Sequence, residues 1–546
     1  MSATSVSPTL RPIEAVASDL GLSADDISVH GRYRARVHLD LPHSDRRGRY
    51  VLVTASTPTA SGSGKTVSAI GLGMGLRQLG HRSVVTLRES AVGPTFGMKG
   101  GGAGGGAAQV LPLEECLLRL TDTPAVTAAH NLLAAVVDDT LHRGTGIDPA
   151  AVTWRRVLDV DDRALRQIVV GLGGAANGPL RETGFDITAS SEVMALLALS
   201  RDPADLRDRL NALVIGWDRE DKPVTAGRLG AAGAMAVLLS DSLQPNLMQT
   251  TEGTPVVVHT GPFGNLAAGN SSVIGDRLLL PRTDYLVTEA GFAADLGAEK
   301  FFDIKCRASG LQPDAVVVVT NIPSLRAHGG GDPGEADVAA VAAGCANLRH
   351  HVRVLLRYGR PVVVAINTFP GDQPDETAVV GEAALGAGAV AAVPHHAFAR
   401  GGVGCEDLAA AVVGACDGAP TSPILPVYAL EASYEDKVHA IATGVYGASD
   451  VAWSASARRD LSRFVNAGYD GLPVCMAKTP LSLSHDPKLL GAPTGFTLPV
   501  QSVRLAAGAG YLTVLTGDIM TMPGLPAHPR LLDMDVDASG AIVGLV

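Results

Sequence analysis

Five short runs of aliphatic and β-branched residues constrain the fold of this 546-residue chain more than any other feature. They show little polar alternation, which is typical of parallel strands that are buried on both faces of a sheet. Helical stretches separate most of them, and this alternation indicates a doubly wound α/β protein with a mostly parallel sheet. The runs are Tyr50–Ala55, Ser83–Leu87, Asp284–Thr288, Ala315–Thr320 and Pro361–Ile366.

The first run leads through a loop of small residues into a helix, with Gly62-Ser63-Gly64-Lys65-Thr66 at the junction. A helix N-terminus attracts anions because its N–H groups are unpaired and its dipole is positive there. Lys65 adds a full charge, and Thr66 can reach a magnesium ion. The segment predicts a phosphate-binding P-loop, although Thr59 stands where the usual G-x-x-x-x-G-K-[ST] pattern has its first glycine.

Polar or aromatic residues follow each of the other four predicted strands. Ligands of open α/β sheets bind beyond the carboxyl ends of the strands, so we expect these residues to converge on one site. In chain order they are Arg88 and Glu89, Glu289-Ala290-Gly291-Phe292, Asn321, and Asn367-Thr368-Phe369.

Composition excludes several classes of protein. The net charge of −11 and the pI of about 5.7 argue against a nucleic-acid partner bound through a basic surface. We find neither an apolar run long enough for a membrane helix nor an N-terminal secretory signal. Six scattered cysteines suit reduced thiols. We therefore expect a cytoplasmic protein with no membrane partner.

A glycine-rich segment, Gly97–Gly106, has seven glycines in ten residues around Lys99. Two interpretations stay open. The segment is a flexible linker, or its backbone amides wrap around an anion.

Several long strings of residues, in a fixed order along the chain, are far more specific than a lone phosphate loop. They resemble the formate–tetrahydrofolate ligase family, also called 10-formyltetrahydrofolate synthetase, and the resemblance covers nearly the whole chain. The strings are Gly93–Gly101, Gly184–Thr188, Thr251–Pro255, Val287–Phe292, Ala294–Arg307, Leu472–Thr479 and Thr516–Pro526.

The resemblance implies a reaction in which formate, ATP and tetrahydrofolate give 10-formyltetrahydrofolate, ADP and phosphate, through a formyl-phosphate intermediate. It also implies ATP with Mg²⁺, a monovalent cation (K⁺ or NH₄⁺) as activator, and a homotetramer. It further implies one family unit over residues 1–546. Within this unit we expect a nucleotide-binding core at 1–112 and 250–370, an inserted mainly helical region at 113–249, and a C-terminal α/β region at 371–546.

The first half of this reaction needs fixed positive charge, because formate and the γ-phosphate of ATP are both anions. Lys65, Arg88 and Lys99 are the candidate catalytic residues, and Arg88 lies in a segment that resembles the family's formyl-phosphate site. An arginine can bind a carboxylate or an acyl phosphate through two parallel hydrogen bonds. Thr66 is expected to hold magnesium through ATP. The expected ATP-binding residues are Thr59, Ala60, Ser61, Gly62, Ser63, Gly64, Lys65 and Thr66.

The second half of the reaction needs a grip on the flat, aromatic pterin, for which stacking is suited. Phe369 matches a family aromatic, and Phe398 stands where the family usually has tryptophan. Asp122 matches a family aspartate and could accept hydrogen bonds from the pterin. Core packing for the two phenylalanines and helix capping for Asp122 are the competing interpretations. His130, His259 and His328 fall within matching motifs, and we expect at most one of them to act as an acid or base.

The chain departs from the family pattern at several positions near the predicted site. Ala60 and Ser63 replace a usual proline and glutamate in the loop, Pro124 and Ala268 replace histidines, and Phe398 replaces tryptophan. Two alternatives to the ligase therefore stay open. One is a P-loop ATPase that acts on another carboxylate, and the other is a weakly active folate- or nucleotide-binding paralogue.

Overall fold

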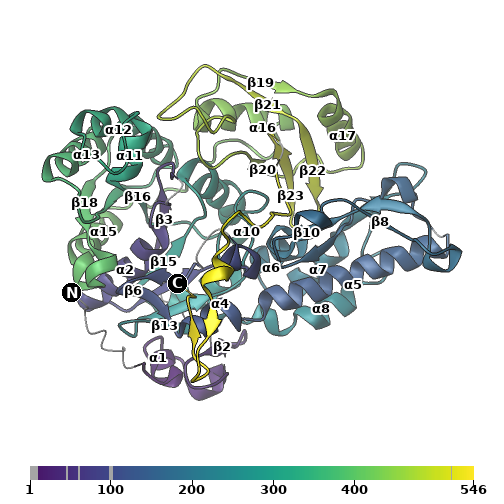
Figure 1. The fold of residues 1–546 in the computed structure, drawn as a ribbon, viewed down its shortest axis with the longest axis horizontal. Helices are drawn as coiled ribbons and strands as arrows, with labels where there is room; N and C mark the ends of the chain where they lie inside the picture. Colours follow the sequence, from purple (N-terminus) through teal and green to yellow (C-terminus); the bar gives the residue numbers. More distant parts are fainter. Residues whose placement is uncertain are drawn as a thin grey trace.

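The computed structural model of the chain describes residues 10–42, 44, 47–59, 62–97, 102–144, 146–517 and 519–545. A 12-stranded mixed sheet lies at its centre, and helices cover both faces of this sheet (Figure 1). The strand order is β1-β2-β13-β14-β4-β15-β3-β16-β17-β18, with β6 paired to β13 and β5 paired to β6. The strands are β1 (Ile27–Val29), β2 (Ala35–Val37), β3 (Arg49–Ala55), β4 (Ser83–Leu87), β5 (Gly104–Gly105), β6 (Ala108–Leu111), β13 (Asn246–Thr250), β14 (Pro255–Val258), β15 (Tyr285–Glu289), β16 (Ala315–Thr320), β17 (Val362–Asn367) and β18 (Ala391–His395).

The five strands predicted from the sequence are confirmed, and they form the centre of the sheet as β4, β15, β3, β16 and β17. All neighbours from β14 through to β18 run parallel. The antiparallel strands lie together at the other edge, from β13 outward to β1. The carboxyl ends of β3, β4, β15, β16 and β17 therefore face the same way, as the prediction of a common site requires.

Alternate residues of the central strands belong to two different hydrophobic cores. In β16, Val316 and Val318 pack into one core, while Val317 and Val319 pack into the other. Fully burying a valine stabilises a fold by roughly 1.5–3 kcal/mol. The absence of polar alternation in these runs thus has a direct cause, because neither face of the sheet meets water.

Helices pack on the two faces of this sheet. One layer contains α2 (Lys65–Gln78) and α15 (Glu406–Asp417), which contact each other, and the other contains α11 (Ile322–His328), α12 (Val338–Leu356) and α13 (Pro374–Gly386). Residues 383 to 393, which are mostly apolar, span the end of α13 and the start of β18. None of the helices in the described part of the chain combines the length and the apolarity that a membrane crossing needs.

A separate hydrophobic core supports the region between β6 and β13. Leu133, Leu196, Leu210 and Met235 are buried in it, one from each of four helices. These helices are α5 (Asp122–His142), α6 (Glu192–Leu199), α7 (Pro203–Ala212) and α8 (Ala232–Leu239).

The C-terminal part of the chain forms three small sheets. One pairs β24 (Asp535–Val536) with β25 (Ile542–Val543), and the other two lie beside the helical region (Figure 1). Of these two, one contains β20 (Val474–Ala477), β23 (Tyr511–Leu515) and β22 (Ser502–Ala506), and the other pairs β19 (Asp450–Trp453) with β21 (Thr497–Val500). The boundaries expected at 112, 250 and 370 stay predictions. Strand β18 lies beyond 370 in the sequence and still pairs with β17 in the main sheet. All six cysteines are buried free thiols.

Candidate functional site

The described part of the loop that joins β3 to α2 contains two glycines with an unusual backbone conformation. Gly62 and Gly64 have φ of 80° and 77°, a left-handed conformation that glycine adopts without penalty. A β-carbon on Gly64 would also collide with the side-chain amide of Asn367, at the end of β17. The Asn321 side chain donates to the Gly62 carbonyl over 3.2 Å. Ala60 and Ser61 lie outside the described residues.

A threonine and a glutamate meet where α2 begins. The Thr66 hydroxyl donates to Oε2 of Glu289 over 2.9 Å, and Glu289 is the last residue of β15. Two hard oxygen donors at this place suit a magnesium ion. Glu289 is one of the strand-end residues expected at a common site, and its contact with Thr66 is what the sequence pattern could not predict.

Arg88 follows β4 directly and enters the same site. Its Nη1 donates to the Pro262 carbonyl over 3.1 Å. Its Nη2 lies beside Gly291, 3.0 Å from the position that a β-carbon on this glycine would take. Burial lowers the pKa of the guanidinium, while the charge of Glu289 opposes that shift. Arginine starts from a pKa far above neutrality, so Arg88 keeps its charge. Arg88, Thr66 and Glu289 are thereby brought together.

The structure describes only the first of the two predicted catalytic lysines, Lys65 and Lys99. Lys65 is the first residue of α2, and its Nζ donates to the Ser63 hydroxyl over 3.3 Å. Lys99 lies outside the described residues, so its role stays a prediction. The described end of the glycine-rich segment is ordered, because Gly104–Gly105 pairs with β6. The flexible-linker interpretation is therefore wrong for that part.

Asp122 is fully buried at the start of α5, and both of its carboxylate oxygens have partners. Arg36 donates to one oxygen over 3.0 Å, and the Thr260 backbone N–H donates to the other over 3.1 Å. Glu89 accepts the N–H groups of Asp122 and Thr123, which satisfies the first turn of the helix. Burial and the charge of Asp122 raise the pKa of Glu89 well above its usual range. A contact between Asp122 and a pterin stays a prediction, and here its oxygens serve the fold.

The two candidate stacking residues are both exposed, but they occupy different surroundings. Phe369 is 43% exposed and lines a cavity of about 540 Å³ together with Thr368, Asp372 and His396. Phe398 is 57% exposed on α14 (Ala397–Arg400), next to the turn at Gly105 and Gly106. Core packing does not explain either ring. Their roles in folate binding stay predictions.

The three histidines of the family motifs are buried, and each uses both ring nitrogens. His130 contacts the Ser191 hydroxyl and the Arg155 carbonyl, each over 2.8 Å. His259 contacts the Ser272 hydroxyl and the Ser242 carbonyl, over 2.5 and 2.7 Å. His328 contacts the Thr57 carbonyl and the Gly491 N–H. Burial lowers the pKa of all three. Both ring nitrogens of each histidine thus already have partners, and an acid or base role for one of them stays a prediction.

Together, the fold and the site define an α/β protein that presents a glycine turn, a helix N-terminus, an arginine and a glutamate at the carboxyl ends of parallel strands. Such an arrangement suits an anionic ligand.

Comparison with known proteins identifies the family. The family model described as "Formate–tetrahydrofolate ligase" matches residues 2–546. A formate–tetrahydrofolate ligase of Roseiflexus sp. (strain RS-1) is 54% identical, with 98% of each chain covered. The formate–tetrahydrofolate ligase of Paracoccus denitrificans is 51% identical, with 98% of this chain and 97% of its own covered. That of Cutibacterium acnes is 50% identical, with 98% of each chain covered. The chain belongs to the formate–tetrahydrofolate ligase family.

Proposed function

We propose that this protein joins formate to tetrahydrofolate at the expense of ATP and gives 10-formyltetrahydrofolate, ADP and phosphate. The observation that carries the proposal is the meeting of Arg88, Thr66 and Glu289 at the ends of β4 and β15, beside the start of α2. In the proposal, Arg88 binds the acyl phosphate, and the Thr66 and Glu289 oxygens hold a nucleotide-bound metal. Membership of the family, over the full length of the chain, supports the same reaction.

In this proposal the segment Thr59–Thr66 is a P-loop that holds the phosphates of ATP. The N–H groups at the start of α2 and the Lys65 ammonium supply positive charge to the β- and γ-phosphates. The residues fit a magnesium ion, because the Thr66 hydroxyl and the Glu289 carboxylate lie 2.9 Å apart at the loop. Mg²⁺ bound there neutralises part of the phosphate charge.

Arg88 is the proposed partner of formate in the first step. A formate oxygen forms a bond to the γ-phosphorus as the bond from that phosphorus to ADP breaks, which gives formyl phosphate. The Arg88 guanidinium orients formate and lowers the repulsion between the two anions. Lys99 is the third proposed cationic residue.

In the second step the N10 amine of tetrahydrofolate attacks the formyl carbon. Phosphate leaves with the bonding electron pair, and the nitrogen loses its proton. Phe369 is the proposed stacking surface for the pterin, since it lines an open cavity. Phe398 and Asp122 are further candidates. Activation by K⁺ or NH₄⁺, a homotetramer and a cytoplasmic location stay predictions from the family resemblance.

A steady-state assay tests the proposal directly. ADP release should require both formate and tetrahydrofolate, and it should match the 10-formyltetrahydrofolate formed. ADP release that depends on neither substrate would indicate the alternative, an ATPase that acts on another carboxylate. Slow formation of 10-formyltetrahydrofolate that disappears in Lys65→Ala would indicate the other alternative, a weakly active paralogue.

A further inference from the structure

Thr57 lies two residues before the predicted P-loop, and buried side chains contact all three of its polar groups. Its backbone N–H donates to Oδ1 of Asn347 over 3.0 Å. Its hydroxyl accepts from Nδ2 of Asn347 over 2.9 Å and lies 2.9 Å from Nε2 of His351. Its carbonyl lies 2.9 Å from Nε2 of His328. These contacts fix the chain where it leaves β3.

The hydrogen bonds also fix the orientation of two of these side chains. Asn347 must turn Oδ1 toward the Thr57 N–H, which leaves Nδ2 for the Thr57 hydroxyl and the Gly491 carbonyl at 2.8 Å. His328 must carry its proton on Nε2, because that nitrogen faces a carbonyl while Nδ1 accepts the Gly491 N–H over 3.1 Å. A neutral His328 therefore contacts Thr57 and Gly491 at once.

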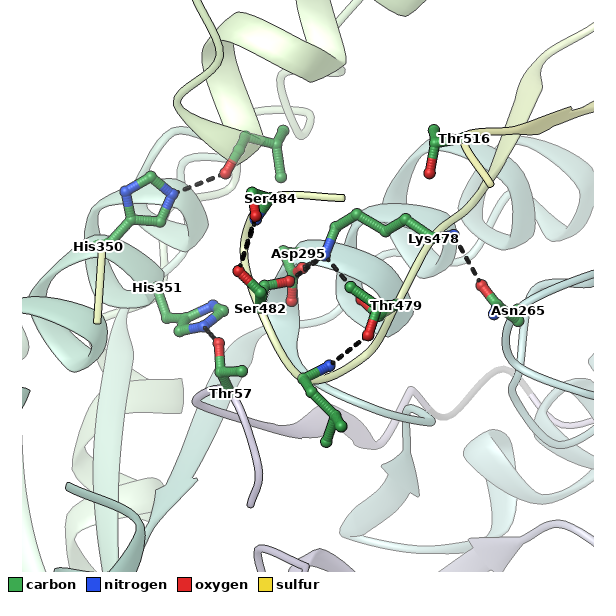
Figure 2. A network of polar contacts seen from close by, with 12 residues as sticks. Thr57, Asn265, Asp295, His350, His351, Lys478, Thr479, Ser482, Ser484 and Thr516 are labelled. Atoms are coloured by element: carbon green, nitrogen blue, oxygen red, sulfur yellow. Dashed lines mark hydrogen bonds and ion pairs between the residues drawn. The ribbon is translucent and has the colours of Figure 1, made fainter. Parts of the chain in front are cut away.

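Gly491 ends a C-terminal segment, residues 478–491, that is itself anchored in the interior. The Lys478 ammonium pairs with Asp295 over 2.7 Å and donates to the Ser482 carbonyl over 2.5 Å. The Ser482 hydroxyl donates to the Leu489 carbonyl over 2.6 Å. In Figure 2 this segment curves past Asp295, with Thr57 and His351 close beside it. A buried ion pair is stable only when its geometry is good, so the pair of Lys478 and Asp295 restricts the position of this segment.

We propose that His328, Asn347 and His351 are positioning residues, which hold the chain at Thr57, where it leads into the nucleotide loop. The contacts of His328 and Asn347 with Gly491 couple the position of Thr57 to segment 478–491. The inference rests on the proposed function, because it takes residues 59–66 to be the ATP site. None of the three side chains needs to touch ATP. His328 and Asn347 act through the backbone of Thr57, and Asn347 and His351 act through its hydroxyl. Segment 478–491 thereby gains a role at a site far away in the sequence.

The test uses Thr57→Val, which removes the hydroxyl and keeps a branched side chain of similar shape. We expect the dissociation constant of Mg-ADP, measured by calorimetry, and the KM for ATP to rise about tenfold, as for other residues that orient a binding group. The KM values for formate and tetrahydrofolate should stay within about twofold. Thr57→Ser, which keeps the hydroxyl, should restore the affinity. Asn347→Leu is the second variant, and thermal melting confirms that each variant is folded.

His350→Gln is the matched control. His350 is the neighbour of His351 on α12, and it contacts the Val445 carbonyl over 2.7 Å, away from Thr57 (Figure 2). This variant should bind Mg-ADP like the unchanged protein. Ser482→Ala tests the C-terminal link, and we expect about a threefold loss of Mg-ADP affinity.

Three results would overturn the inference. Normal Mg-ADP affinity in folded Thr57→Val and Asn347→Leu would remove the positioning role, and normal affinity in Ser482→Ala would remove the link to segment 478–491. An equal rise in all three KM values would indicate general loosening instead. An unchanged protein that binds Mg-ADP but makes no 10-formyltetrahydrofolate would refute the proposed function and not this inference.

Discussion

At the scale of single residues, the site depends on opposite charges held close together. Arg88 is half-buried directly after β4, and Glu289 at the end of β15 stabilises its charge. Glu289 also accepts the Thr66 hydrogen bond, so one carboxylate serves both the arginine and the start of α2. Changes at these two positions should therefore have different effects.

Arg88→Ala should abolish formyl transfer and leave nucleotide binding largely intact. Removing one fixed charge that acts on developing negative charge typically costs on the order of 10²–10³ in kcat. The assay is 10-formyltetrahydrofolate formation, with Mg-ADP affinity from calorimetry beside it. An equal loss of Mg-ADP affinity would place Arg88 on the nucleotide instead.

Glu289→Gln keeps the shape of the side chain but removes its charge. We expect kcat to fall about 10- to 100-fold and the Mg²⁺ concentration for half-maximal activity to rise, because the carboxylate next to Thr66 orients that ligand. A magnesium titration of the steady-state rate measures both. A variant with a lower kcat and an unchanged magnesium requirement would contradict the role at Thr66.

At the scale of elements, the turn between β3 and α2 is shaped by its neighbours as well as by its own residues. Gly64 is the residue before the helix, and the Asn367 amide from β17 lies against it. The end of β17, two residues before Phe369, thus also limits the loop that leads to Lys65. Gly62, two residues before Gly64, has the same left-handed backbone, with open space around it.

Gly64→Ala and Gly62→Ala form a matched pair that separates these two effects. Both alanines would be strained at positive φ, by roughly 1 kcal/mol. Only the alanine at 64 would also collide with Asn367. We expect Mg-ADP affinity to fall more than tenfold in Gly64→Ala and by less than that in Gly62→Ala, as measured by calorimetry. Equal losses would mean that the Asn367 contact does not matter.

At the scale of the whole molecule, buried neutral histidines tie stability to pH. Burial lowers the pKa of His130 and His395 to about 4 and that of His351 to about 3, from an ordinary value of 6.5. The unfolded chain then binds these protons at a higher pH than the folded chain does. The stability is complete above about pH 6.5 and is lost as the pH falls toward the folded values.

We therefore expect each such histidine to lower the free energy of unfolding between pH 6.5 and pH 5, by up to roughly 1.4 kcal/mol per pH unit. Glu192, whose pKa burial raises to about 7, contributes with the opposite sign, so the histidine contribution is measured as a difference between variants. In denaturant titrations, His130→Gln should lose less stability from pH 6.5 to pH 5 than the unchanged protein, whereas His142→Gln, at an exposed position, should follow the unchanged protein. A difference between His130→Gln and the unchanged protein that is the same at both pH values would contradict the prediction.

Much of the architecture could be predicted from the sequence, because a strand buried on both faces must be apolar at every position. The four residues from Val316 to Val319 illustrate this, since they pack alternately into two hydrophobic cores. The same reasoning located Arg88 and Asn367 at strand ends. It could not assign Glu289 its partner or show that the oxygens of Asp122 are already occupied, because those contacts join residues far apart in the chain.

The family, the order of the central strands along the chain and the small-residue loop before Lys65 could all be predicted from the sequence alone. These features follow from local patterns and from long matching strings. The partners of the functional side chains, and the contacts of Thr57 with His328, Asn347 and His351, became visible only in the folded chain. Hydrogen-bond partners depend on position in space, which a linear pattern does not encode. Burial then fixes those contacts, since a buried polar group without a partner costs about 1–3 kcal/mol.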